Sequence, residues 1–236
     1  MPIKRTHFRT HLFSLDATEI ALHKNLMTCV IFGRSNPVYV GNEQAKIEAD
    51  IVCIKPDILH RVIVGEGGAE VMFLDGVQLS TAQANFEKVD QTWQHVPEAF
   101  NALDYKTIAD FRQNLDGNGA PPDPQILEIV EELYSSPLNR MSQDELSTRL
   151  GLERTQALRH FKAVTGQTFR KFKKWAASVA VTHSAHQGQE IGIAGIDAGF
   201  SDASHTTRTA GEVFGLTPTH GLDNLRNVST LVPDPS

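Results

Sequence analysis

Short apolar runs separated by turn residues dominate the first third of the chain. Runs rich in valine and isoleucine predict strands at 7–15, 27–32, 38–40, 45–54, 61–64 and 69–74. Glycine, proline and asparagine mark the turns between these runs. Because the strands follow one another closely, with no helical crossover, they predict an antiparallel β-barrel or sandwich. The apolar interior of such a structure is either a packed core or a ligand pocket, and the pattern leaves both open.

The pattern becomes helical after residue 81. A helix is expected at 97–115, with an apolar stripe made of Phe100, Leu103, Ile108, Phe111 and Leu115. This helix either packs on the barrel or pairs with a second copy of the chain. Three prolines and two glycines within 116–124 then indicate a solvated linker.

These patterns together predict an α+β fold of two domains, each with its own core. A sensor or dimerisation domain is expected at 1–116, a linker at 117–123, an all-α domain at 124–221 and a flexible tail at 222–236. The all-α domain begins with an amphipathic helix at 124–134. Ser142 and Glu145 then form a capping box for a helix that ends at Gly151.

The helix that follows Gly151 can be oriented from its apolar positions. Ala157, Phe161 and Val164 fall on one side, so Thr155 and Arg159 point away from it. An exposed arginine on a helix suits the DNA major groove, where its guanidinium bonds guanine O6 and N7. Alternatively, this side is simply the solvated face of a helical hairpin.

Charge supports nucleic-acid binding only locally. The 236-residue chain has a formal net charge of −6, but 154–174 contains seven Lys or Arg residues and no acidic residue. No apolar run approaches the 18 residues of a membrane span, so we expect a soluble, cytoplasmic protein without a membrane partner. Cys29 and Cys53 lie in apolar contexts, which favours two buried reduced thiols over a redox sensor.

Histidines in the first domain raise the question of a metal. The segment 50–62 has a strand, a proline turn and His60, and is similar to the cupin pattern. Metal sites need three or more converging ligands. His60 has no nearby HxH partner. His7, His11 and His23 are candidate metal ligands only because they are histidines in the same domain. We therefore expect a structural or pocket-lining histidine, with no metal and no cofactor.

The second domain resembles the AraC/XylS family of transcription regulators over about 123–220. The resemblance rests on the order of motifs: Glu-Leu, Gly-Leu and Arg-x-Phe-Lys within 145–162, a basic connector, and Gly-Phe-Ser-Asp-x-Ser-His at 199–205. Arg208 and the Phe-Gly-Leu-Thr-Pro sequence at 214–218 follow at the family spacing. The resemblance implies two helix-turn-helix units, with a rigid helix at about 168–186 that places two recognition helices in successive major grooves. It also implies a preceding sensor domain, often cupin-like.

The resemblance implies roles for individual residues. Those expected to contact base edges are Thr155, Leu158, Arg159, Ser204, Thr207 and Arg208. Those expected at DNA phosphates are Arg154, Gln156, Lys162, Arg170, Lys171, Lys174 and His205. Double-stranded DNA is the expected partner, together with a small-molecule effector, a second copy bound through the first domain, and RNA polymerase if the chain is an activator.

The second unit departs from the family pattern. Thr206 and Ala210 stand where bulky apolar residues are usual, Gly211 lies within the helix, and Gly192 and Gly195 lie in the preceding one. In the first unit, Glu153 occupies the usual Ser or Thr cap position. We therefore expect the second unit to be less stable than the first.

Two other function classes, an enzyme and a protein-interaction module, have less support in the sequence. A cupin-type enzyme would place chemistry at His60, but the sequence supplies no nucleophile–base pair, phosphate loop or metal triad, so no catalysis is expected. A protein-interaction module with a degenerate helix-turn-helix domain is opposed by the basic residues of 154–174.

Overall fold

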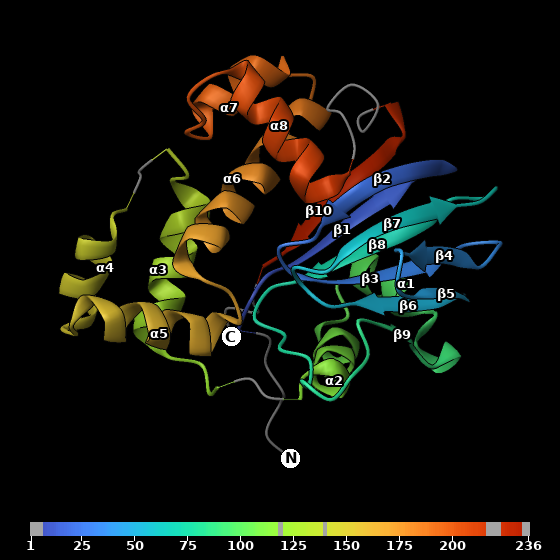
Figure 1. The fold of residues 1–236 in the computed structure, drawn as a ribbon, viewed down its shortest axis with the longest axis horizontal. Helices are drawn as coiled ribbons and strands as arrows, with labels where there is room; N and C mark the ends of the chain where they lie inside the picture. The colour runs from blue at the N-terminus through green and yellow to red at the C-terminus, as the bar shows by residue number, and fades with distance from the viewer. Residues whose placement is uncertain (1–6, 118–119, 139–140, 216–222, 233–236) are drawn as a thin grey trace.

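The apolar runs of the first half form two antiparallel sheets (Figure 1). The computed structural model describes residues 7–117, 120–138, 141–215 and 223–232. One sheet has six strands, in the order β10 (Leu225–Leu231), β1 (Thr10–Leu15), β8 (Ala69–Leu74), β3 (Thr28–Gly33), β6 (Ile51–Ile54) and β9 (Phe86–Lys88). The other has four, in the order β2 (Thr18–Lys24), β7 (Leu59–Val64), β4 (Val38–Gly41) and β5 (Lys46–Ala49).

The six-stranded sheet is buried on both faces. Successive residues of a strand point to opposite faces. Phe13 and Phe73 therefore pack in the cluster shared with the four-stranded sheet, while Leu12 and Met72 pack in a second cluster. Two helices, α1 (Val96–Asn101) and α2 (Tyr105–Leu115), cover this second face, and Phe111 is buried there. This double burial explains why the inner strands β8, β3 and β6 are almost continuously apolar.

Two elements expected as single units are divided. The strand expected at 45–54 splits at Asp50 into β5 and β6, which belong to different sheets. The carbonyl of Asp50 accepts a hydrogen bond from the Gly33 amide at 2.8 Å, where the chain crosses between the sheets. The helix expected at 97–115 breaks into α1 and α2 because Leu103 adopts a left-handed conformation, with φ of 58°.

Three strands were not expected from the sequence. In β2 only Ile20 and His23 are buried, so its pattern lacks an apolar run. The short strand β9 falls within the stretch that was expected to be helical. The strand β10 falls in the expected flexible tail, and that expectation is wrong for 225–231: these residues pair antiparallel with β1.

The second half consists of helices. These are α3 (Pro124–Ser135), α4 (Gln143–Leu150), α5 (Arg154–Thr165), α6 (Phe169–His186), α7 (Ile191–Asp197) and α8 (Ala203–Phe214). The capping box of Ser142 and Glu145 is confirmed, and Thr168 caps α6, whereas the Glu153 side chain makes no capping hydrogen bond. Figure 1 shows the pairs α4–α5 and α7–α8 at either end of α6. No helix in the described ranges is long and apolar enough to cross a bilayer.

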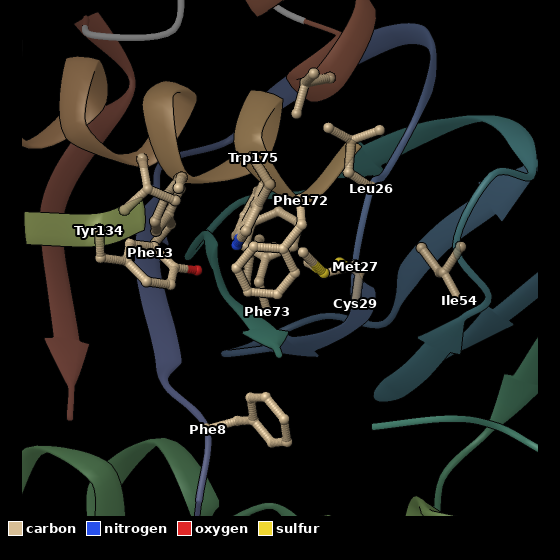
Figure 2. Packing of buried hydrophobic residues seen from close by; sticks show 14 of the residues in the cluster. Phe8, Phe13, Leu26, Met27, Cys29, Ile54, Phe73, Tyr134, Phe172 and Trp175 are labelled. Atoms are coloured by element: carbon tan, nitrogen blue, oxygen red, sulfur yellow. The ribbon is translucent and has the colours of Figure 1, made fainter. Parts of the chain in front are cut away.

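The two halves share one hydrophobic cluster, so the expectation of a separate core for each domain is wrong. Figure 2 shows Trp175 and Phe172 of α6 directed toward Phe73 of the six-stranded sheet. The ring centroids of Phe73 and Trp175 lie 4.9 Å apart, and those of Phe13 and Phe214 lie 5.8 Å apart. The sheet therefore positions α6 and the end of α8 directly.

Asp75 forms a buried polar connection across the same boundary. Its side chain is 0% exposed and accepts hydrogen bonds from Trp175 Nε1, at 2.9 Å, and from the Tyr134 hydroxyl. His11 Nε2 lies 3.5 Å from the same carboxylate. The Asp75 carbonyl accepts from Arg112, whose guanidinium also donates to the Thr10 hydroxyl at 2.8 Å. Asp75 thus joins α3 and α6 to the sheet.

Close approach explains one of the unusual glycines. A side chain at Gly195 of α7 would overlap the buried Thr206 of α8, so glycine lets the two helices pack closely. Gly211 has no such role, because no atom lies within 4 Å of the position its Cβ would occupy.

Gly211→Ala is therefore expected to raise the free energy of unfolding by up to about 1 kcal/mol, because alanine favours a helix interior and nothing obstructs it here. Urea unfolding followed by circular dichroism would measure this change. Gly195→Ala is the matched variant and is expected to destabilise. An unfolding midpoint that falls in both variants would show that Gly211 has a packing role.

Candidate nucleic-acid interface and interdomain cavity

The helix α5 presents one polar face to solvent. Ala157, Phe161 and Val164 are buried beneath it, while Thr155 and Arg159 are exposed. Leu158 is half-buried beside them. The facing expected from the sequence is therefore found, and Arg159 is accessible to solvent.

The helix α8 has the same division. Thr206 and Val213 are buried, while Ser204, Thr207 and Arg208 are exposed. The Asp202 side chain caps the helix by accepting from the His205 amide at 2.7 Å. The His205 ring lies 3.1 Å from the Ser201 hydroxyl. Leu216, Thr217 and Pro218, which complete the C-terminal motif, lie outside the described residues.

The basic residues expected at phosphates fall into two groups. Gln156, Lys162 and Arg170 are exposed, and so is Arg154, which donates to Gln143. Lys171 and Lys174 are paired within the chain. Lys171 Nζ lies 2.6 Å from Asp57 Oδ1 of the β-sheet half, and Lys174 Nζ lies 3.0 Å from Glu212 Oε2 of α8. These two ammonium groups would have to exchange partners to reach a phosphate.

A cavity of about 100 Å³ lies between the β-sheets and α6–α8. Its apolar lining comes from both halves of the chain, with Phe13, Ile31, Val62 and Phe73 from strands and Val181, Phe200 and Phe214 from the helical side. Thr206 and Ala210 also line it. The small residues that depart from the family pattern in α8 therefore border an open space between the halves, where bulkier side chains would fill it.

One end of the cavity is polar. His23 Nε2 lies 3.1 Å from the side-chain oxygen of Asn25, and Asn25 Nδ2 lies 3.4 Å from His60 Nε2. The two imidazole centroids are 4.3 Å apart. Burial lowers the pKa of His60 to about 4, with a further contribution from His23, and burial also lowers the pKa of His23. Both rings are therefore neutral near pH 7.

The end of α8 docks beside these histidines. The Ala21 amide of β2 donates to the Gly215 carbonyl at 3.1 Å. Gly215 has φ of 67°, and a side chain there would clash with His23 and Ile20. The C-terminal end of α8 thus lies against β2, next to the polar end of the cavity.

The other histidines within the described ranges, and the two cysteines, form no group that could hold a metal ion. His11 lies apart from this cluster, beside Asp75. Among the described residues, no group of three His, Cys, Asp or Glu side chains could hold a metal ion. Cys29 and Cys53 are both buried and free, and burial raises the pKa of both thiols, to about 12 for Cys53.

Sequence reasoning named His23 and His60 but missed the contribution of Asn25 and of α6. Ser178 and Thr182 of α6 line the cavity together with the strands. Two small hydroxyl residues four positions apart on an otherwise apolar helix face were the available signal. Which strands they face depends on the docking of the two halves, which the sequence pattern does not encode.

Comparison with known proteins gives a shared fold. No protein-family model and no curated protein matches the chain. A crystal structure of ToxT from Vibrio cholerae O395 is 11% identical, with a TM-score of 0.63 over 94% of this chain and 99% of ToxT. A second ToxT structure is 10% identical, with a TM-score of 0.62 over 93% and 100% of the two chains. ToxT with a bound unsaturated fatty acid is 11% identical, with a TM-score of 0.58 over 94% and 97%.

Proposed function

We propose that this chain is a sequence-specific DNA-binding transcription regulator of the AraC/XylS type, in which α5 and α8 occupy successive major grooves. The observation that carries the proposal is the pair of exposed arginines, Arg159 and Arg208, each on the outer face of the second helix of a helix pair. The rigid helix α6 separates the two pairs. Arginine at such a position suits bidentate bonding to guanine.

The shared fold supports this proposal. The matching structures are of ToxT, an AraC-family regulator, and they extend over nearly the whole of both chains. The proposed base contacts are Thr155, Leu158, Arg159, Ser204, Thr207 and Arg208. The exposed Arg154, Gln156, Lys162 and Arg170 are proposed to hold phosphates, with His205, and with Lys171 and Lys174 after they leave their carboxylate partners.

A small molecule in the interdomain cavity is proposed to control DNA binding. The cavity is lined by both halves, and α8 is docked on β2 at its polar end. Two of the similar structures are of ToxT bound to an unsaturated fatty acid and to a naphthalenyl butenoic acid. A ligand that binds one docking geometry better than the other shifts the population toward it. Dimerisation through 1–116 and contact with RNA polymerase, in the case of an activator, stay predictions.

Arg159→Ala is expected to weaken binding to the chain's specific DNA site by about 1–3 kcal/mol and to relax base preference at one position. The specific site would first be selected from a random DNA pool, and affinity would then be measured by fluorescence anisotropy. Lys106→Ala is the control, because it removes one exposed positive charge that lies on α2, outside the two helix pairs, and pairs with Asp110 of the same helix. Unchanged specific affinity for Arg159→Ala would sink the assignment of α5.

Arg208→Ala measures the contribution of the second unit to DNA affinity in the same assay. Its loss is expected to be smaller than that of Arg159→Ala, because Thr206, Ala210 and Gly211 predict a second unit that is less stable than the first. An equal or larger loss would show that α8 is the stronger contact. Failure of the unaltered chain to bind any DNA at low salt would overturn the proposed function itself.

A further inference from the structure

The polar end of the interdomain cavity has more hydrogen-bond acceptors than donors. His23 Nδ1 lies 2.9 Å from the Ala21 carbonyl, and His60 Nδ1 lies 2.8 Å from the Ile58 carbonyl. A carbonyl oxygen only accepts, so each neutral ring carries its proton on Nδ1 and leaves Nε2 as an acceptor. Both Nε2 atoms face Asn25.

Asn25 cannot satisfy both acceptors. Its amide turns the Nδ2 donor to one imidazole and the Oδ1 acceptor to the other, and rotating the amide only exchanges the two. One Nε2 atom therefore faces an oxygen that also accepts. A hydrogen-bond donor from a ligand would satisfy an otherwise unmet acceptor, which is worth about tenfold or more in affinity in a buried site.

The cavity also lacks a positive charge. Its described lining contains no Lys and no Arg. The titratable groups at its polar end are His23 from β2, His60 from β7 and Cys29 from β3, and the helices contribute the hydroxyls of Ser178, Thr182 and Thr206. Burial keeps the imidazoles neutral and the thiol protonated. A carboxylate placed here would be a buried charge without a partner, which strongly disfavours its binding.

Size limits the occupant further. The cavity of about 100 Å³ is of the same order as an apolar protein cavity of roughly 150 Å³ that accommodates a benzene ring. The side chains of Phe13, Phe73 and Phe214 are among the residues that line it. The space thus suits one ring or a short branched chain.

We propose that the cavity binds an uncharged, largely apolar small molecule that carries one hydrogen-bond donor, with His23 and His60 accepting from that donor. This inference deepens the proposed control of DNA binding and rests on it for its biological meaning. It differs from the ligands named for ToxT, both of which are acids.

Three probes of similar shape test the proposal on the full chain: benzyl alcohol, toluene and benzoate, with affinities measured by NMR titration. At pH 7.5, benzyl alcohol is expected to bind about tenfold or more tightly than toluene, which lacks the donor, and than benzoate, which brings a charge. Benzoate is expected to bind more tightly as the pH falls toward 5, because a larger fraction is then the uncharged benzoic acid. Benzoate binding at pH 7.5 as tightly as benzyl alcohol overturns the proposal, as does binding of none of the probes.

Two variants assign the effect to this cavity. Ala210→Leu fills the space and is expected to abolish binding of all three probes. Thr182→Lys places an ammonium at the partly exposed rim and is expected to reverse the preference, so that benzoate binds best at pH 7.5. Unaltered probe binding in both variants shows that the probes bind elsewhere and overturns the proposal. DNA affinity without a probe is measured separately, so a failure of DNA binding remains distinct from a failure of the ligand class.

Discussion

Replacing Asp75 with leucine is expected to lower the free energy of unfolding by about 3–5 kcal/mol, the cost of removing one partner from a buried charged network. Leucine has a similar size but accepts no hydrogen bond. Trp175 Nε1 and the Tyr134 hydroxyl would then be buried without partners. Unfolding in guanidinium chloride, followed by tryptophan fluorescence, measures the change.

The charges around Asp75 increase the expected effect. Burial lowers the pKa of Arg112 to about 10, and Asp75 is the largest of the influences that oppose this lowering. The guanidinium therefore stays charged near pH 7 and depends on that carboxylate. Burial, followed by the Asp75 charge, raises the pKa of Tyr134 well above its usual value, so the phenol stays protonated and donates.

Asp75→Asn is the matched control. An amide oxygen can accept from Trp175, and its NH₂ can donate to the Tyr134 oxygen, whose proton then turns toward His11 at 3.2 Å. Every hydrogen bond is kept and only the charge is lost, so less than half of the leucine effect is expected. Equal losses for both variants would mean that the charge opposite Arg112 matters and the hydrogen bonds do not. A wild-type midpoint for the leucine variant would refute the role of the network.

The features that were predicted correctly from the sequence are those that depend on local patterns. The strand at 69–74, the capping box at Ser142 and the facing of Arg159 depend on residues a few positions apart, so their physical causes are visible in the chain itself. The break in the helix at Leu103 could not be predicted, because leucine rarely adopts a left-handed conformation and the sequence gives no sign of it.

Contacts between the halves could not be predicted in this way. From the sequence alone, Thr206 and Ala210 indicate a loss of core volume within a separate helical domain. In the structure they border a cavity whose opposite wall includes Phe13 and Phe73, from strands more than a hundred residues earlier. The polar group of His23, Asn25 and His60 likewise requires β2 and β7 to be neighbours, which their spacing alone does not specify.

The strand β10 shows the same limitation. Its apolar residues, Leu225, Val228 and Leu231, fall at every third position, without an apolar run or a strict alternation, which is also typical of a polar tail. In the structure Val228 and Leu231 are buried, opposite Phe13 and Thr10 of β1. The Thr230 hydroxyl lies 2.9 Å from His11 Nδ1 and 2.9 Å from His183 Nε2 of α6. The helical half is thus attached to the sheet at both of its ends in the chain, by the linker and by β10.

Removing all residues after Asp223 is therefore expected to destabilise the chain by several kcal/mol. Burial of Val228 and Leu231 alone contributes about 1.5–3 kcal/mol each, and the loss of β10 would leave the backbone of β1 as an unpaired edge that favours association. Guanidinium unfolding and light scattering measure the two effects. Arg226→Ala is the control within the strand, because its exposed ion pair with Asp16 is worth no more than about 1 kcal/mol. A truncated chain that keeps the oligomeric state and the unfolding midpoint of the full chain would show that β10 contributes nothing to stability, as expected for a flexible tail.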